Sequence, residues 1–265
     1  MDYLDTLSHF ASSLDYSKLE PQVQDQVGWI LADTVAAMAA GSAEPELRAI
    51  AKRQAAGTPH HSALLIGLGQ KSTPEAAAFI NGTSGTFLEM DEGNRFSRGH
   101  PAVHVIPAAL ALSQERTATA ESFLAGIVVG YEVGSRLGAA SQLRGAMHPH
   151  GTWGTLGAAA ACGRVAGLDD NDMRQTINIS ASLTTATSKQ TMLEGGLVRN
   201  VYAGLSNRNG LLALNLAECG FNGERDGPSS LLGKIISESF QTEAVTQGLG
   251  HDWHLMRNYF KLHSC

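Results

Sequence analysis

Residues 121–138 read ESFLAGIVVGYEVGSRLG, and glycine recurs at every fourth position of this stretch. Because an α-helix turns once every 3.6 residues, glycines 126, 130, 134 and 138 fall on one helical face. Such a face lets a second backbone approach closely, so we predict tight helix–helix packing here and no phosphate-binding role. The spacing is best known from membrane helices, but Glu132 and Arg136 disfavour a membrane span.

Outward from this stretch, apolar residues recur at helical spacing along most of the chain. The clearest case is Pro21–Gly41, where Gly41 ends the pattern. Further helices are predicted over about Leu4–Leu14, Glu44–Ala56, Pro74–Ile80, Pro101–Ser113, Thr155–Gly167, Leu168–Ser182, Val201–Gly220 and Leu231–Phe240.

Three stretches interrupt the helical pattern. Gly57–His61 is predicted to be a break, with His60 and His61 on the surface. Ala63–Gly69 is predicted to be one short strand or a buried turn, and Gly82–Gly99 to be a helix end followed by an ordered loop. Regular alternation of strands and helices is absent. The sequence therefore predicts an all-α fold, a compact bundle of roughly eight to eleven helices.

Length and composition set limits on the class of protein. A chain of 265 residues is near the upper size for one hydrophobic core, and 43% hydrophobic with 17% charged residues is typical of a globular protein. The net charge is −6 and basic runs are missing, which disfavours nucleic acid as a partner and requires any cationic site to be local. The N-terminus lacks the features of a signal peptide, and the apolar stretches are too short to span a membrane. Three sparse cysteines predict no disulfide framework and favour a cytoplasmic location.

The segment 87–104, FLEMDEGNRFSRGHPAVH, gathers three carboxylates, two arginines and two histidines. Glu89 and Asp91 are two positions apart and cannot share a helical face, so we expect them to have different roles. A nearby cation would lower the pKa of a carboxylate, and burial would raise it. The alternative, equally weighted on the residues alone, is a solvated loop with exposed ion pairs.

A second segment, RGAMHPHGTWGT at residues 144–155, places His148 and His150 on either side of a proline. Histidine is the side chain best suited to proton transfer near neutral pH. A helix predicted to begin near Thr152 would offer free N–H groups to an anion. Metal ligation by the two histidines competes with this interpretation, but a third ligand at the usual spacing is missing. Two histidines that merely fill the core would fit this glycine-rich segment poorly.

The third segment, GGLVRNVYAG at residues 195–204, holds a single cation, Arg199. Its planar guanidinium suits a carboxylate ligand. The alternative is a helix-end charge that pairs locally with Glu194. Motifs for a nucleophile elbow, a phosphate loop, a dinucleotide fold or a CxxC pair are missing, so neither a catalytic triad nor a nucleotide cofactor has support.

These segments, in this order, resemble the MmgE/PrpD family, which includes dehydratases, a decarboxylase and an epimerase. The resemblance runs through Asp33-Thr34 to Gly41, Asn81-Gly82, Glu89–Pro101, His148–Gly154, Arg199–Gly204, Gly220-Phe221 and Asn258–Lys261. It implies a large helical domain followed by a smaller α+β lid, a homodimer, and an active site between the two domains. On this basis residues 1–250 form the helical domain, and 251–265 are the start of a truncated lid domain or a C-terminal tail.

The resemblance also implies residue roles. His148, His100, Glu89 and Asp91 fall on catalytic positions, with Glu92 beside Asp91 in a pair of acids, and Arg199, His150, Arg98 and Thr152 are the expected substrate-binding residues. Gly93 stands where some members have Thr, Arg199 where several have Lys, and His150 where Thr is more usual. Arginine cannot act as a base but can hold a carboxylate.

The implied chemistry is proton abstraction beside a carboxylate, without a metal or organic cofactor. His148 is the best acid–base candidate, and His100 is its partner or a substrate binder. Three functions follow. The first is a lyase, a dehydratase or decarboxylase acting on a small polycarboxylate. The second is an epimerase of a small dicarboxylate, and the third is a lidless helical domain without catalysis. Both enzymatic functions require His100, His148 and Arg199 to converge on one pocket, with Arg95 and Arg98 steering anions toward it.

Overall fold

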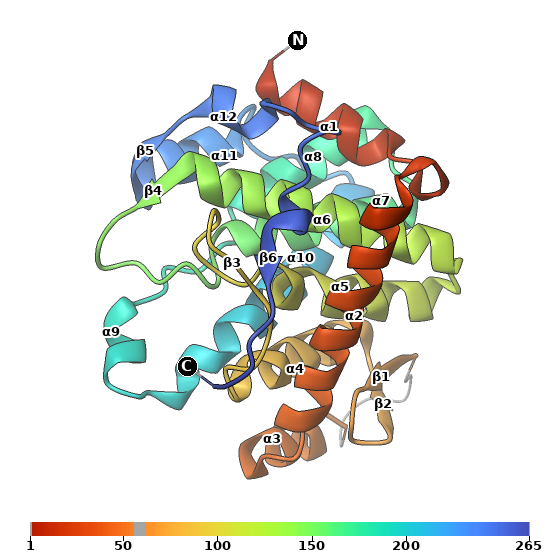
Figure 1. Cartoon of the computed structure of the whole chain (residues 1–265), viewed down its shortest axis with the longest axis vertical. Helices are drawn as coiled ribbons and strands as arrows, with labels where there is room; N and C mark the ends of the chain where they lie inside the picture. The colour runs from red at the N-terminus through yellow and green to blue at the C-terminus, as the bar shows by residue number, and fades with distance from the viewer. Residues whose placement is uncertain (1, 56–61, 265) are drawn as a thin grey trace.

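The computed structural model describes residues 2–55 and 62–264, so the predicted break at Gly57–His61, with His60 and His61, lies outside the described residues. Within them the chain forms twelve α-helices and three two-stranded sheets (Figure 1). The helices are α1 (Tyr3–Ser13), α2 (Pro21–Gly41), α3 (Pro45–Ala55), α4 (Pro74–Phe87), α5 (Pro101–Arg116), α6 (Ala120–Ala140), α7 (Trp153–Ala166), α8 (Asp170–Ala181), α9 (Lys189–Leu193), α10 (Val201–Glu218), α11 (Gly227–Ser230) and α12 (Thr242–Thr246). The all-α class is confirmed. The helices outnumber the predicted eight to eleven because α9, α11 and α12 are only four or five residues long.

The strands are short and antiparallel, and they connect parts of the chain that are mostly distant in sequence. They are β1 (Ala63–Leu65) with β2 (Gln70–Ser72), β3 (Gly93–Asn94) with β6 (Asn258–Tyr259), and β4 (Ser141–Leu143) with β5 (Ser237–Phe240). Four short helical turns complete the structure: η1 (Tyr16–Lys18), η2 (Leu197–Asn200), η3 (Leu231–Ile235) and η4 (His254–Arg257). The predicted helix over Leu231–Phe240 is correct only in its first half, where Leu231–Ile235 form the π-helical turn η3; Ser237–Phe240 form a strand, because pairing of β5 with β4 outweighs local propensity.

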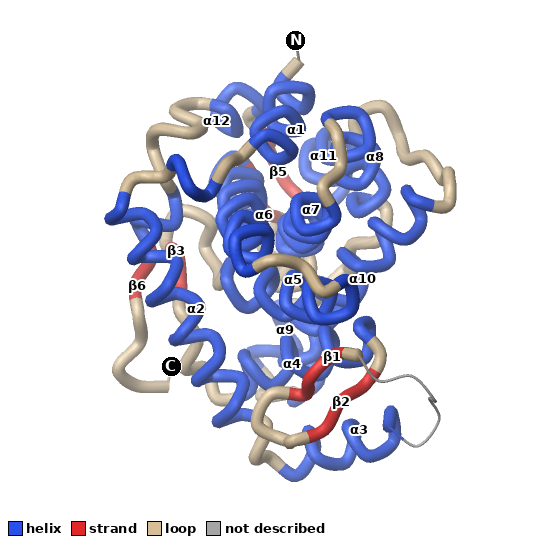
Figure 2. The backbone as a smooth tube through the Cα atoms, turned by 90° about the vertical axis from the view of Figure 1, so that its right-hand side faces the viewer, coloured by secondary structure: helices blue, strands red, loops and turns tan. Residues whose placement is uncertain are grey.

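Helices α5, α6, α7 and α10 form the centre of the bundle, and α1, α2, α4 and α8 pack around them (Figure 2). The predicted glycine face lies on α6 and is turned toward α7. A Cβ atom added at Gly130 would lie 2.7 Å from the carbonyl oxygen of Gly157, so only glycine fits this helix crossing. The close packing predicted for residues 121–138 is therefore confirmed.

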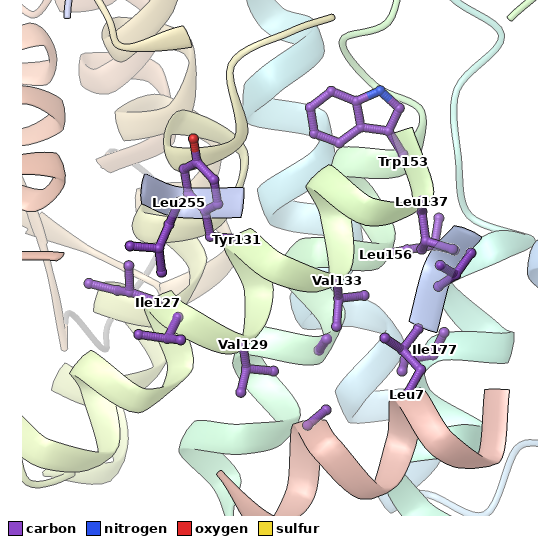
Figure 3. Close-up of a cluster of buried hydrophobic side chains, with 14 of the residues drawn as sticks. Leu7, Ile127, Val129, Tyr131, Val133, Leu137, Trp153, Leu156, Ile177 and Leu255 are labelled. Atoms are coloured by element: carbon purple, nitrogen blue, oxygen red, sulfur yellow. The ribbon is translucent and has the colours of Figure 1, made fainter. Parts of the chain in front are cut away.

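Apolar side chains from α1, α6, α7 and α8 fill one part of the interior (Figure 3). Leu7, Val133 and Ile177 are fully buried there. Burial of each such side chain contributes roughly 1.5–3 kcal/mol to stability. Leu255 of η4 joins the same cluster, so part of the C-terminal segment belongs to the core.

Residues 251–264 lie against the helical body. The buried Arg136 guanidinium bonds to Glu132 at 2.9 Å and donates to the carbonyl oxygens of Gln247 at 2.8 Å and Asp252 at 2.5 Å. Beyond this clamp, β6 lies beside β3 in both views of the backbone (Figures 1 and 2). This pairing places the C-terminal segment beside the loop that follows α4. The domain boundary at residue 250 stays a prediction.

No described helix combines the length and the apolar character needed to cross a membrane. Cys162 is buried and Cys219 is exposed, and both are free thiols. Cys265 lies outside the described residues.

Candidate active site

A cavity of about 450 Å³ opens where the loops after α4, β3 and β4 meet the segment before α7 and the turn η2. Most of the charged and histidine side chains that line it come from the three segments singled out in the sequence. They are Glu89, Arg95, Arg98, His100, Arg144, His148, His150 and Arg199, and Lys189 is added from outside these segments. Among the described lining residues, five are permanent cations and one is a carboxylate. A protein of net charge −6 thus has a local cationic cavity suited to anions.

His100 precedes the first turn of α5, and its ring is oriented by a carboxylate. Asp91 is fully buried, and its Oδ2 lies 2.8 Å from Nδ1 of His100. An ionised carboxylate can only accept a hydrogen bond, so Nδ1 carries the proton and Nε2 is left with a lone pair. The other oxygen of Asp91 lies 3.6 Å from the ammonium of Lys261, which stabilises the negative charge. His100 therefore has the arrangement of a general base.

Glu92, next to Asp91, fixes this loop to three helices. Its backbone N–H donates to Asp33 of α2, and its carboxylate accepts from the N–H of Ala102 in α5 and the hydroxyl of Tyr131 in α6. Complete burial raises the pKa of Glu92 to about 7, against the hydrogen bond from Ala102, which lowers it. Glu92 is thus a support for its neighbour Asp91 and does not line the cavity.

His148 has the opposite tautomer. The backbone N–H of His150 donates to its Nδ1 at 3.1 Å, so the neutral ring carries its proton on Nε2. Hydrogen bonds with Thr187 at 2.9 Å and 2.7 Å fix the backbone of His148. Burial, and then the charges of His100 and Lys189, lowers the pKa of His148 to about 4, so the ring is neutral at pH 7. Nε of Arg199 also directs its N–H toward Nε2 of His148, at 3.4 Å. A neutral imidazole can accept at only one nitrogen, so this contact competes with the bond from His150, and the tautomer assigned here follows the shorter of the two.

Four imidazoles pack edge to face at the cavity: His100, His148 and His150 line it, and His104 lies behind His150. The ring centroid of His150 lies 4.8 Å from that of His100, 4.7 Å from that of His148 and 4.7 Å from that of His104. His104 fits because residue 154 is glycine, where a Cβ atom would lie 2.6 Å from the ring. Burial, with the charge of His100, lowers the pKa of His104 to about 3. Burial and the neighbouring histidines hold the pKa of His150 well below its usual range.

Arg199 and Lys261 share one carboxylate. Arg199 forms an ion pair with Glu89, and Nζ of Lys261 lies 3.7 Å from the other oxygen of that carboxylate. Lys261 also donates to the carbonyl of Glu89 at 3.0 Å, and its side chain is only 4% exposed. The partner of Arg199 in the structure is thus Glu89 and not the nearby Glu194.

The structure brings most of the predicted site residues together. Six of them line the cavity: Glu89, Arg98, His100, His148, His150 and Arg199. Asp91 lies directly behind His100. Thr152 is fully buried at the start of α7, and its hydroxyl donates to the carbonyl of Pro149 at 2.5 Å, so it does not reach the cavity.

Sequence reasoning missed Lys261, His104, Arg144 and Lys189. His104 lies four residues after His100 on a helix, and this spacing indicates a shared face. Lys261 gave no local signal, because only the pairing of β6 with β3 brings it to the site. In residues 2–55 and 62–264, His, Cys, Asp and Glu side chains form no group of three or more that could hold a metal ion.

Comparison with known proteins identifies relatives of this chain. A cis-aconitate decarboxylase of Aspergillus terreus is 27% identical over 277 residues, which cover 98% of this chain and 56% of that protein. The cis-aconitate decarboxylase-like protein oryM of Aspergillus oryzae is 26% identical over 279 residues, which cover 98% of this chain and 58% of that protein. The chain thus spans little more than half the length of these relatives. A model of the MmgE/PrpD N-terminal domain matches residues 5–230, and the protein therefore belongs to the MmgE/PrpD family.

Proposed function

We propose that this chain carries the acid–base site of a lyase that removes carbon dioxide or water from a small polycarboxylate, without a metal or organic cofactor. The proposal depends on one observation: His100 and His148 line the same cavity, and their Nδ1 atoms have opposite partners, a carboxylate and a backbone N–H. One imidazole offers a lone pair and the other offers an N–H group. The cations around them suit a substrate with several carboxylates. The decarboxylase names of the relatives support the same class of substrate.

His100 is the proton carrier in this proposal. Its Nε2 removes a proton from the carbon beside a carboxylate, and Asp91 stabilises the resulting imidazolium. In a dehydration this imidazolium passes the proton to the departing hydroxyl, which leaves as water. In a decarboxylation no C–H bond is broken: His100 takes a proton from solvent and delivers it to the carbon that keeps the electron pair of the broken bond to carbon dioxide. This assignment exchanges the roles expected from the sequence, where His148 was the principal acid–base candidate.

His148 is a hydrogen-bond donor and not a proton carrier. A neutral imidazole is a very weak acid, but its Nε2–H can bind a carboxylate oxygen whose negative charge grows in the transition state. Arg199, whose Nε lies 3.4 Å from Nε2 of His148, places a positive charge beside the same carboxylate. The two groups together lower the barrier to forming a carbanion beside the carboxylate, which elimination and decarboxylation share.

The test is turnover of cis-aconitate by the full chain, followed by NMR and carbon dioxide release. His100→Gln is expected to lower kcat by roughly 10²–10⁴-fold, because it removes the proton carrier. His148→Gln keeps a side-chain N–H donor and should lose less activity than His148→Ala. His251→Gln, a change at an exposed histidine away from the cavity, is the matched control and should leave the rate unchanged.

The results separate the alternatives. Full activity in His100→Gln would contradict the proposal, and full loss in His148→Gln would return His148 to the role of proton carrier. Substrate analogues with a hydroxyl group beside the reacting carbon test dehydration through the absorbance of a new C=C bond. Deuterium exchange without carbon dioxide or C=C formation identifies an epimerase.

We also propose that the chain forms a homodimer. Leu193, Leu197 and Val198 are 55–64% exposed next to the cavity, and an exposed apolar patch of this kind is typical of a protein interface. Light scattering should then give twice the 27.9 kDa mass of the chain. A monomer at micromolar concentration would contradict the dimer.

A further inference from the structure

The Glu89 carboxylate is already paired with Arg199, the cation that the proposed function assigns to a substrate carboxylate. One of its oxygens is paired with Arg199 and the other lies 3.7 Å from Nζ of Lys261. Its side chain is 23% exposed, so solvent and ligands reach it from the cavity. A carboxylate bound at Arg199 must therefore either compete with Glu89 or share the guanidinium with it.

The backbone also holds Glu89 in an unusual conformation. Its φ is +53°, in the left-handed region that follows many helix ends and favours glycine or asparagine. A glutamate is strained at such a position. Such strain is concentrated at functional sites, which favours a functional role for this carboxylate over an incidental ion pair.

A second cavity gives this side chain a place to move. It has a volume of about 390 Å³ and adjoins the first, and both are lined by Glu89, Met192 and Arg199. Gly195 and Gly196 lie on its wall, which leaves room for another side chain. The Glu89–Arg199 pair thus lies at the boundary between the two cavities.

We infer that Glu89 is a specificity-determining residue whose carboxylate pairs with the inner cations, Arg199 and Lys261, and is displaced from Arg199 by a substrate carboxylate. The inference rests on the proposed function and specifies its substrate class. Displacing Glu89 from Arg199 costs binding free energy, so a substrate with a single carboxylate binds weakly.

Four exposed cations that line the first cavity attract the other carboxylates of the substrate. They are Arg95, Arg98, Arg144 and Lys189. In the part of the chain that the structure describes, the one carboxylate close to them is Glu238, 3.8 Å from Arg144. A substrate with a second and third carboxylate can contact these residues while the first displaces Glu89. The site therefore selects di- and tricarboxylates and rejects monocarboxylates.

Binding of tricarballylate, an unreactive tricarboxylate, tests the inference without requiring turnover. Isothermal titration should show that Glu89→Gln binds it about tenfold more tightly than the unmodified chain, or ~1.4 kcal/mol. Glu89→Asn is the second variant, because asparagine tolerates the left-handed backbone better than glutamine and keeps the test valid if Glu89→Gln does not fold. Glu194→Gln is the matched control: it removes the same charge from the same region but outside the cavity lining, and affinity should stay within twofold. Butyrate, a monocarboxylate of similar length, should bind the unmodified chain at least a hundredfold more weakly than tricarballylate.

A crystal structure with tricarballylate gives a direct measurement. We expect the Glu89 side chain to have left Arg199 and turned toward the second cavity. The inference is overturned if that ion pair persists in the complex, or if tricarballylate binds Glu89→Gln and Glu89→Asn no more tightly than the unmodified chain. If the unmodified chain and both variants fail to bind tricarballylate at all, the polycarboxylate site itself is refuted, and the proposed function with it. Tight binding of butyrate to the unmodified chain would overturn the inference alone.

Discussion

Acidification should destabilise this protein through its buried histidines. The pKa of His104 is lowered from 6.5 to about 3, that of His148 to about 4, and that of His150 well below 6.5. The unfolded chain therefore binds more protons than the folded chain as the pH falls through 6.5, and the stability present above that pH is lost below it. Between pH 7.5 and pH 5.5 His104, His148 and the partly buried His254, whose pKa burial also lowers to about 4, each account for a loss of ~1.4 kcal/mol, and His150 acts in the same direction.

Glu92 acts in the opposite direction. Its pKa is raised from 4.5 to about 7, so the folded chain binds this proton more tightly and gains stability as the pH falls through 7. Over the same interval this gain is about 2 kcal/mol. The net expectation is a loss of about 2 kcal/mol on going from pH 7.5 to pH 5.5.

Urea unfolding at the two pH values, followed by tryptophan fluorescence, measures this difference. His104→Phe replaces one titrating ring by a non-titrating ring and should reduce the pH dependence by ~1.4 kcal/mol. Each variant is compared with itself at two pH values, so any change in packing cancels. His251→Phe, at an exposed histidine, is the control. The reasoning is refuted if the unmodified chain is as stable at pH 5.5 as at pH 7.5, or if His104→Phe leaves the pH dependence unchanged.

Two further predictions concern stability at neutral pH. Gly154→Ala would place a Cβ atom 2.6 Å from the His104 ring and should cost roughly 1–3 kcal/mol in urea unfolding, whereas Gly145→Ala, with nothing within 4 Å, should cost less than 0.5 kcal/mol. Arg136→Leu should cost roughly 3–5 kcal/mol because it leaves Glu132 buried without its partner, and the double variant with Glu132→Leu should recover part of that loss. Equal stability of the two glycine variants, or of the single and double arginine variants, would contradict these assignments.

The sequence was sufficient to predict the helical class and most helices. Apolar residues recur with the period of the helix, and capping residues such as Asp169 mark where helices begin, so these features depend on local physics. The glycine face of α6 was predictable for the same reason. The strand β5 was not, because it exists only through pairing with β4, a segment almost a hundred residues earlier.

The residues of the site were largely predictable, but their partners were not. His100, His148 and Arg199 stood out because their residue types and glycine-rich surroundings are typical of catalysis. Their contacts depend on tertiary structure: Arg199 pairs with Glu89, 110 positions away, and not with Glu194, five positions away. Lys261 reaches the site only because the Arg136 clamp and the β3–β6 pair return the C-terminal segment to it.

The distinction between the two histidines of the candidate site shows why partners matter more than residue type. Each imidazole directly precedes a proline, with His148 buried and His100 partly exposed, and residue type alone gives them no different roles. A carboxylate at Nδ1 of His100 and a backbone N–H at Nδ1 of His148 assign the protons in opposite ways. Exchanging these neighbours would exchange the base and the hydrogen-bond donor without altering either histidine. The roles proposed here for the two histidines therefore depend on Asp91 and on the turn at His150, which set the tautomers, as much as on the imidazoles themselves.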